Sequence, residues 1–570
     1  MSRCFRIEPW QSRSFFQKRV AVPIDFSFSA MAARSENAPA RWRRPFLKWL
    51  DGIEAGWAVP LLLVGFVSIW LAFLSIAYLN GDLHPDTLET WTLGRRFEWG
   101  NPKHPPLMGW VARAWTSVFP LTDWSFQVLT MTNSAIALWS VDLISRRFVR
   151  GDKRVVVLLL LMLLPTYQFH AQRFNANTVL LAIWPLATYC FLRSFETRHV
   201  AWAAAAGATA AIAMLGKYYS IFLIGSFAFA AIVHPKRREF FASLAPWVSA
   251  TVGLAVLGPH LYWLATTGAE PFGYALVVHG GVAFGPSLIE GLFFLLGLAA
   301  AMAIPAVTWV MIAGYRLRRF PVDFRAMNSG LLLLFLVCAG TIAFPVITAV
   351  TLGTDLPSLW ALQGLFLFGV LIVCGTSYSI ERFYSVNLAV LVMGIALVAV
   401  IVAAPIHAVY RNSHPFEEGR NFYRLSALEL TRQWHELSDE PLPAVSGDDA
   451  LAFATAFYSP DHPVYARPFA YQYTSGLPRK MTLEKGWAAM CFVGQDDCND
   501  WMGKAAARAS RFNRSEFVVQ STLLGRLGAS RRVTALIVPP RNEEMITPSP
   551  ATSNANDFSS KRRARAKSDE

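Results

Sequence analysis

Charged residues are scarce in this chain. Asp, Glu, Lys and Arg make up only 16% of its 570 residues, whereas 54% are apolar and the mean hydropathy is +0.35. This balance excludes an ordinary soluble protein. The formal net charge of +14 is gathered in short basic clusters beside long apolar segments. The sequence therefore offers no soluble basic face, and we expect no nucleic-acid partner.

Three further features are missing from the sequence. Residues 411–540 contain neither a glycine-rich nucleotide-binding loop nor His and Cys residues at metal-ligand spacing. The apolar part shows no internal repeat, which many transporters carry. The first 40 residues lack the basic start and long apolar core of a cleaved secretory signal, and Met31 is an alternative start.

Apolar segments long enough to cross a membrane recur through the first 410 residues. A helix needs about 20 apolar residues to span the hydrocarbon core. The candidate segments lie near 57–79, 124–144, 155–171, 177–195, 200–215, 218–234, 242–265, 287–313, 329–351, 358–377 and 386–409. The pair at 200–234 is short and tightly joined through Gly216-Lys217. The sequence thus predicts a polytopic α-helical membrane protein with about 11 transmembrane helices.

Basic residues predict the orientation, because short loops rich in Lys and Arg stay on the cytoplasmic side. The N-terminal segment and alternate loops are basic, whereas 266–286 and 352–357 contain no Lys or Arg. We therefore expect a cytoplasmic segment over 1–50 and a transmembrane domain over 51–410 in a bacterial inner membrane. The loop 80–121 is expected on the periplasmic side, and so is the C-terminal region, which follows an odd number of spans.

The pattern changes after residue 410. Helical periodicity at 422–437 and 450–457 alternates with short strand-like runs at 444–448 and 534–538. This alternation predicts a small extracytoplasmic α/β domain over 411–540, which would support or cover a site. Cys491 and Cys498 within it could form a disulfide or remain two free thiols. Residues 541–570 are poor in apolar side chains, and we expect a disordered tail.

The first outer loop, from Asn80 to Trp110, is dense with polar chemistry. Asp82, Asp86 and Glu89 stand at i, i+4 and i+7, so on one helix they would form an acidic stripe. Pro85 suits the first turn of that helix. The stripe could be a solvated amphipathic face. Alternatively, Asp86 or Glu89 could accept a proton from a hydroxyl nucleophile in a cleft beside the membrane.

Cations and amides gather at the same predicted side of the membrane. Lys103 and His104 precede Pro105-Pro106, whose fixed backbone directs them toward headgroup depth. Other candidates for a phosphate or sugar are Arg173, Asn175, Asn177, Lys217, Tyr218 and His279. The alternatives are an interfacial lysine at 103, a snorkelling arginine at 173 and a structural histidine at 279. A lysine in the tight turn at 217 is costly to place near lipid unless it snorkels or pairs with an anion.

Four sequence elements together resemble a known family. They read HPDTLETW, KHPPLMGW, RFNANTVLLAIWP and MLGKYYS, and the resemblance covers roughly residues 55–410. They are similar to the GT-C glycosyltransferases of family 39, which include protein O-mannosyltransferases, lipid A aminoarabinose transferases and rhizobial lipopolysaccharide galacturonosyltransferases. The resemblance implies inverting transfer of a sugar from a polyprenyl-phosphate carrier to an acceptor outside the membrane, which could be lipid A, lipopolysaccharide core, another lipid or a protein.

The resemblance also implies roles for individual residues. Asp86 would be the catalytic base, with Glu89 as the fallback. The carrier phosphate would be held by Lys103, His104, Arg173 and Lys217. Many relatives have an acidic residue where this chain has Asn175 and Asn177, which puts a divalent-metal requirement in doubt without excluding a metal. Two other classes stay open from the sequence: a flippase for a lipid-linked substrate, and a non-catalytic subunit of an envelope-assembly complex.

Overall fold

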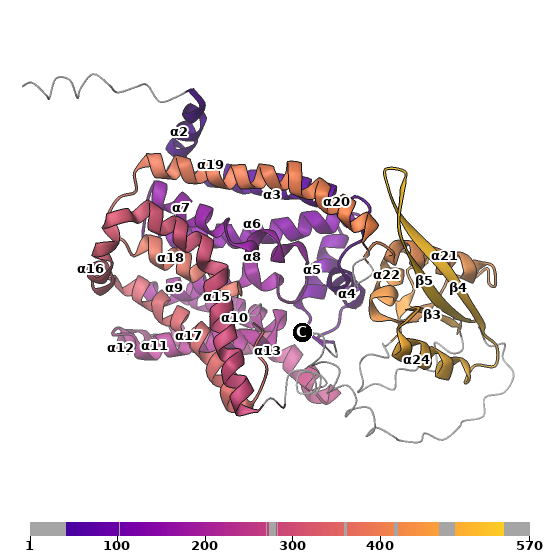
Figure 1. Cartoon of the computed structure of the whole chain (residues 1–570). Helices are drawn as coiled ribbons and strands as arrows, with labels where there is room; N and C mark the ends of the chain where they lie inside the picture. The colour runs from indigo at the N-terminus through magenta and orange to yellow at the C-terminus, as the bar shows by residue number, and fades with distance from the viewer. Residues whose placement is uncertain are drawn as a thin grey trace, which may run out of the picture.

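The computed structural model describes residues 41–101, 103–269, 271–272, 281, 283–357, 362–414, 420–466 and 485–540. Helices dominate as far as residue 413, and a five-stranded sheet with three helices follows (Figure 1). The predicted segments 1–40 and 541–570 and the predicted site residue His279 lie outside the described residues.

The first half of the helical part begins with the short 3₁₀ helix η1 (Arg41–Arg43). It continues through α2 (Arg44–Asp51), α3 (Ala58–Ala77), α4 (Pro85–Gly94), α5 (Leu107–Thr116), α6 (Asp123–Ser145), α7 (Asp152–Leu161), α8 (Pro165–Gln168), η2 (His170–Gln172), α9 (Val179–Thr197), α10 (Val200–Gly216), η3 (Tyr218–Ser220), α11 (Ile221–Val233), α12 (Arg237–Phe241) and α13 (Ala245–Thr267).

The second half comprises α15 (Phe284–Ala313), η4 (Gly314–Arg319), α16 (Phe320–Arg325), α17 (Ser329–Leu352), α18 (Phe366–Cys374), α19 (Arg382–Val398), the π-helical turn η6 (Ala399–Ala403) and α20 (Ala404–Ser413). The last three run as one continuous rod along the bundle beside α3 and end next to the sheet (Figure 1).

Seven helices of the described chain are long and apolar enough to cross a membrane, or eight if the bent pair α7 and α8–η2 is one span. The axes of the two halves differ by 76°. The break follows Leu161, and Pro165 starts the next helix. Three shorter apolar helices, Val200–Gly216, Tyr218–Val233 and Leu362–Cys374, coincide with further predicted segments. A multi-span helical membrane protein is therefore confirmed, and the count of 11 spans stays a prediction.

Burial separates the inner helices from the lipid-facing ones. α7 is buried along almost its whole length, from Arg154 to Leu161, and α9 buries most of its residues. By contrast, α13 leaves Leu254 and Tyr262 exposed, and α15 leaves Phe293 and Val307 exposed, although both helices are apolar. Apolar side chains that remain exposed on long apolar helices are the expected lipid contact of a membrane bundle.

The part after residue 420 contains helices α21 (Tyr423–His435), α22 (Asp449–Tyr458) and α24 (Asp496–Ala506). Its strands are β1 (Ala444–Gly447), β2 (Val464–Tyr465), β3 (Trp487–Phe492), β4 (Asn513–Leu523) and β5 (Arg526–Val538). The sheet order is β2-β1-β3-β5-β4, with β1 parallel to β2 and β3, and β5 antiparallel to β3 and β4. The predicted helices at 422–437 and 450–457 and the first predicted strand are present, whereas the predicted strand at 534–538 is the buried end of the longer β5.

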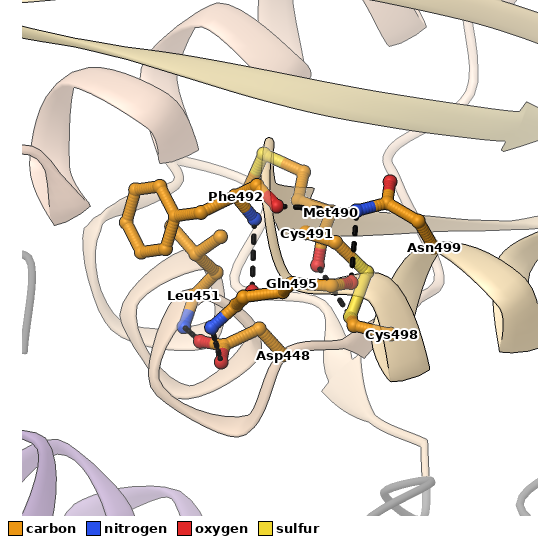
Figure 2. Close-up of a disulfide and its surroundings, with 8 residues drawn as sticks. All are labelled: Asp448, Leu451, Met490, Cys491, Phe492, Gln495, Cys498 and Asn499. Carbon is orange, nitrogen blue, oxygen red and sulfur yellow. Dashed lines mark hydrogen bonds between the residues drawn. A yellow bond between two sulfur atoms is a disulfide. The ribbon is translucent and has the colours of Figure 1, made fainter.

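Cys491 and Cys498 form a disulfide that ties the end of β3 to α24 (Figure 2). The Gln495 side chain at this corner accepts a hydrogen bond from the backbone N–H of Phe492 (3.0 Å) and donates one to Asp448 Oδ2 (2.9 Å). Asp448 Oδ1 in turn caps α22 by accepting from the N–H of Leu451 (3.0 Å). The disulfide corner thereby fixes the turn from β1 into α22.

The junction between sheet and bundle is built from the first predicted outer loop. Asp82 is buried, and its backbone N–H donates to Arg420 O (2.8 Å) while its carboxylate accepts from the N–H of Arg424 (3.0 Å). The predicted acidic stripe is therefore wrong for Asp82, because α4 begins only at Pro85. Tyr458 accepts from the N–H of Leu83 (2.9 Å), and the Trp91 ring packs edge-on against Phe457. As Figure 1 shows, α4 and α5 lie between the bundle and the sheet.

Candidate active site

Asp86 sits in the first turn of α4. His84 is the N-cap residue, and its Nδ1 accepts a hydrogen bond from the backbone N–H of Asp86 (3.2 Å), while Pro85 occupies the next position. A carboxylate in the first turn of a helix is stabilised by the unpaired N–H groups there. The Asp86 side chain is 40% exposed, although His84 beside it is only 5% exposed. The carboxylate is thus fixed at its base and open to a ligand.

Asn175 holds the Asp86 carboxylate from the other side. Its Nδ2 donates to Asp86 Oδ2 (2.8 Å), while its Oδ1 accepts from the backbone N–H groups of Asn177 and Thr178 (2.9 Å each). Because the amide oxygen is engaged by backbone donors, the amide nitrogen is the end that faces Asp86. A neutral donor orients the carboxylate without neutralising its charge.

Lys217 reaches the same region from the turn between α10 and η3. Its Nζ donates to Asn177 Oδ1 (2.6 Å), two residues beyond the asparagine that holds Asp86. Burial lowers the Lys217 pKa from 10.5 to about 7, Asp86 acts to raise it, and Lys103 lowers it further. The short segment Asn175–Asn177 therefore brings together a carboxylate and a lysine, Asp86 and Lys217, that are more than 120 residues apart in sequence.

Lys103 and His104 form a tight turn in the first loop. Asn101 Oδ1 accepts from the backbone N–H groups of Lys103 (3.0 Å) and His104 (2.7 Å). Lys103 Nζ pairs with Glu89 Oε1 at 2.8 Å, and the Glu89 side chain is 5% exposed. A carboxylate buried against a lysine is less accessible than Asp86, which favours Asp86 over Glu89 as the proton acceptor.

The sequence groups His104 with the cations, but the surroundings of its side chain disfavour a positive charge. Burial, together with Lys103 and Lys217, lowers the pKa of His104 well below 6.5. The imidazole is therefore neutral near pH 7, and it can offer one N–H donor instead of a positive charge.

The remaining predicted residues lie around this cluster. Arg173 is exposed, and it acts electrostatically on His170 together with Asp86 and Lys217. Tyr218 Oη is 3.0 Å from His260 Nε2, and His260 Nδ1 is 2.5 Å from the carbonyl of Trp99. This chain of contacts ties the Lys217 turn to the first loop through α13, which the sequence reasoning did not include.

Asp449, at the start of α22, is a residue that sequence reasoning missed. Its Oδ1 accepts from Tyr465 Oη (3.0 Å), and it interacts electrostatically with Glu89 and Lys103 of the first loop. Burial, reinforced by Asp448, raises its pKa from 3.8 to about 7. The only sequence signal was the strand-to-turn pattern at 444–448, which gave no indication that this turn meets residues some 360 positions earlier.

The residues at Asp86 do not fit a resident divalent cation. Asn175 turns its amide nitrogen, which is not a metal ligand, toward the carboxylate. Across the described ranges, no group of three or more His, Cys, Asp or Glu residues is arranged to hold a metal ion.

Comparisons with known proteins concern part of the sequence and the fold. Residues 103–263, which include Lys103, His104, Arg173 and Lys217, match the family model described as dolichyl-phosphate-mannose-protein mannosyltransferase. A comparison with curated protein sequences found no significant match.

The fold resembles two crystal structures of ArnT from Cupriavidus metallidurans. The structure bound to undecaprenyl phosphate has a TM-score of 0.51 at 16% identity, and the apo structure has 0.52 at 14%. Each comparison covers 84% of this chain and 98% of ArnT. The resemblance inferred from the sequence is thereby confirmed: the chain has the GT-C glycosyltransferase fold, and its residues 103–263 carry the pattern of the dolichyl-phosphate-mannose-protein mannosyltransferase family.

Proposed function

We propose that this protein is a membrane glycosyltransferase that moves a sugar from a polyprenyl-phosphate carrier to an envelope acceptor on the periplasmic side. The observation that carries the proposal is the meeting of an accessible carboxylate, Asp86, with Lys217 and the Lys103–His104 turn. These residues come from separate parts of the chain. Their convergence at one end of a membrane bundle is what a reaction on a lipid-linked phosphate requires.

Asp86 acts as the base in this reaction. It accepts the proton of an acceptor hydroxyl, whose oxygen then bonds to the anomeric carbon of the sugar. The bond from that carbon to the carrier phosphate breaks on the opposite face, and the configuration inverts. Asn175 keeps one carboxylate oxygen occupied, so the other is the one directed to the acceptor.

The leaving group is the polyprenyl phosphate, which gains negative charge as its bond to the sugar breaks. Protonated Lys217 and Lys103 supply positive charge, and Arg173 adds an exposed positive charge. Neutral His104 donates a single hydrogen bond. Charges preorganised where negative charge develops commonly supply the largest part of catalysis. ArnT, with the same fold, was crystallised with undecaprenyl phosphate, which supports a carrier of this class.

The test is mass spectrometry of envelope glycolipids and glycoproteins from a strain that lacks this protein. We expect one species to lose the mass of a single hexose, hexuronic acid or related sugar. The wild-type gene should restore it, and Asp86→Asn should not, because an amide cannot accept the proton. General-base loss lowers the rate by roughly 10²–10⁴-fold.

Glu98→Gln is the matched control, since Glu98 is an exposed carboxylate of the same loop. It should restore the missing species fully. An unchanged glycolipid profile in the deletion strain, or full restoration by Asp86→Asn in a folded protein, would contradict the proposal.

A further inference from the structure

A polar cavity lies at the other end of the bundle. It has a volume of about 350 Å³, and its lining includes Arg147, Glu196, Arg198, Lys236 and Gly330. Arg147 follows α6, and Glu196 and Arg198 lie at the end of α9. Lys236 follows α11, and Gly330 lies at the start of α17. Asn175 and Asn177 precede α9, whose 19 residues span about 28 Å at 1.5 Å per residue. The cavity is thus separated from the candidate active site by the length of a membrane helix.

Positive charge is in excess around this cavity. Glu196 pairs with both Arg147 (3.1 Å) and Arg193 (3.2 Å), and Glu239 pairs with Arg198. The Lys236 ammonium adds a fourth cation, and within the described part of the chain it has no hydrogen-bond or ion-pair partner. Three of these cations line the cavity (Arg147, Arg198 and Lys236) against two carboxylates (Glu196 and Glu239), which favours an anionic ligand.

Besides Asn328, Ser329 and Gly330, the rest of the lining is aromatic, and it continues onto an exposed apolar surface. Phe148, Phe195 and Phe240 contribute to the cavity. Beyond Phe240, the chain exposes Phe241 (41%) and Leu244 (67%) between α12 and the exposed helix α13. The cavity thus combines charged residues with aromatic rings and lies beside exposed apolar residues. This combination suits an amphiphile whose phosphate contacts the cations and whose acyl chains lie along the outside of the bundle.

We propose that this cavity binds the headgroup of an acidic phospholipid. The volume lies within the range of small-ligand sites, and basic pockets between membrane helices at the cytoplasmic end are suited to such headgroups. This site is independent of the proposed transfer reaction and lies at the opposite end of the bundle.

Gly330 offers a way to fill the cavity without removing a charge. A Cβ atom at this position would stand 2.9 Å from the Phe148 ring and 3.0 Å from Glu196 Oε1, both in the lining. Gly330 lies in the first turn of α17, where a larger residue has better helix propensity than glycine. Because a Cβ this close forces the Phe148 ring to shift, Gly330→Leu crowds the lining and narrows the space that a headgroup would take.

Native mass spectrometry of the purified full chain in detergent tests the proposal. Phosphatidylglycerol and phosphatidylethanolamine with identical acyl chains are titrated separately. We expect tighter binding of phosphatidylglycerol, a loss of about fivefold in its affinity for Lys236→Gln, as for removal of one cation near a headgroup, and loss of the preference in Gly330→Leu. Arg238→Gln is the control, because Arg238 is an exposed cation two residues away that does not line the cavity.

Three results would overturn the proposal. Equal affinities for the two lipids would remove the headgroup selectivity. An effect of Arg238→Gln as large as that of Lys236→Gln would reduce the binding to general surface charge. Full competition by glycerol phosphate, with no dependence on acyl chains, would make the ligand a soluble anion.

Discussion

The two ends of the helix bundle use charge in different ways. At the end with the lipid-headgroup cavity, cations are paired with carboxylates. Buried Asp142 accepts from Arg154 through both oxygens (3.0 Å each) and from Arg146 (2.7 Å), and Arg316 pairs with Glu381. At the other end Lys103 is paired with Glu89, but Asp86 and Lys217 each make a hydrogen bond to a neutral asparagine amide.

This difference separates structural charges from charges kept for a ligand. A carboxylate that binds a guanidinium is neutralised and contributes to the fold. A carboxylate or ammonium that is oriented by an amide keeps its charge for a partner that arrives later. Substitutions in the buried cluster around Asp142 and substitutions of the amide-held Asp86 and Lys217 should therefore affect different properties, stability in the first case and activity in the second.

The largest effect on stability should come from Asp142→Asn. Asp142 is fully buried, and its loss leaves the Arg154 guanidinium, itself 7% exposed, with only the longer ion pair to the exposed Glu54 (3.8 Å). Breaking a buried pair in this way costs about 3–5 kcal/mol. Thermal unfolding in detergent measures the loss, and Asp86→Asn should unfold close to wild type.

Glu381→Gln provides the control for that measurement. It removes the partner of Arg316 in a pair whose carboxylate is 58% exposed, and exposed pairs contribute about 0–1 kcal/mol. If Asp86→Asn destabilised the protein as much as Asp142→Asn, the distinction between the two ends would fail.

The next largest effect concerns Lys217→Gln, which keeps a donor for Asn177 but removes the charge. We expect binding of the polyprenyl phosphate to weaken by roughly 10–100-fold, the range for a charge-assisted hydrogen bond of about 1.5–3 kcal/mol. Titration with polyprenyl phosphate, followed by native mass spectrometry, measures this. Arg96→Gln, which removes an exposed cation of the first loop, should bind nearly normally.

The same lysine makes carrier binding depend on pH. With a pKa of about 7 in the empty site, Lys217 is protonated below that pH and loses its charge above it. The phosphate binds the protonated form, so affinity should fall as the pH rises through 7. Lys217→Gln should abolish this part of the pH profile, and a profile identical to wild type would exclude Lys217 as its source.

The membrane helices could be predicted from sequence because each depends on a long local run of apolar residues. Where a segment lacks a long apolar run, its boundaries are harder to predict, as Asp82 and β5 show. α4 starts at Pro85, which the sequence suggested, yet Asp82 was assigned to the same stripe although it precedes the helix. In β5, only the buried end from Thr534 to Val538 carries an apolar run; the exposed part of the strand from Arg526 is polar and gave no signal.

The candidate site was predictable residue by residue but not as a set of contacts. Asp86, Lys217 and the asparagines stood out as polar groups beside apolar segments. Their pairing could not be inferred, because the orientation of Asn175 depends on backbone donors at 177 and 178. The neutral state of His104 depends on burial and on two lysines, and neither is visible in local sequence.

The smallest effect should come from Asp449→Asn, and its pH dependence makes it specific. The asparagine oxygen can still accept from Tyr465, so the fold is preserved. Because burial raises the Asp449 pKa to about 7, the wild-type side chain is mostly neutral below that pH and resembles the variant. Above pH 7 its charge acts on Lys103 and Glu89. The KM for the lipid-linked donor should therefore differ between wild type and variant only at alkaline pH. The difference should be less than about tenfold, because it comes from one partly screened charge. A constant ratio at all pH values would mean that Asp449 acts through packing alone.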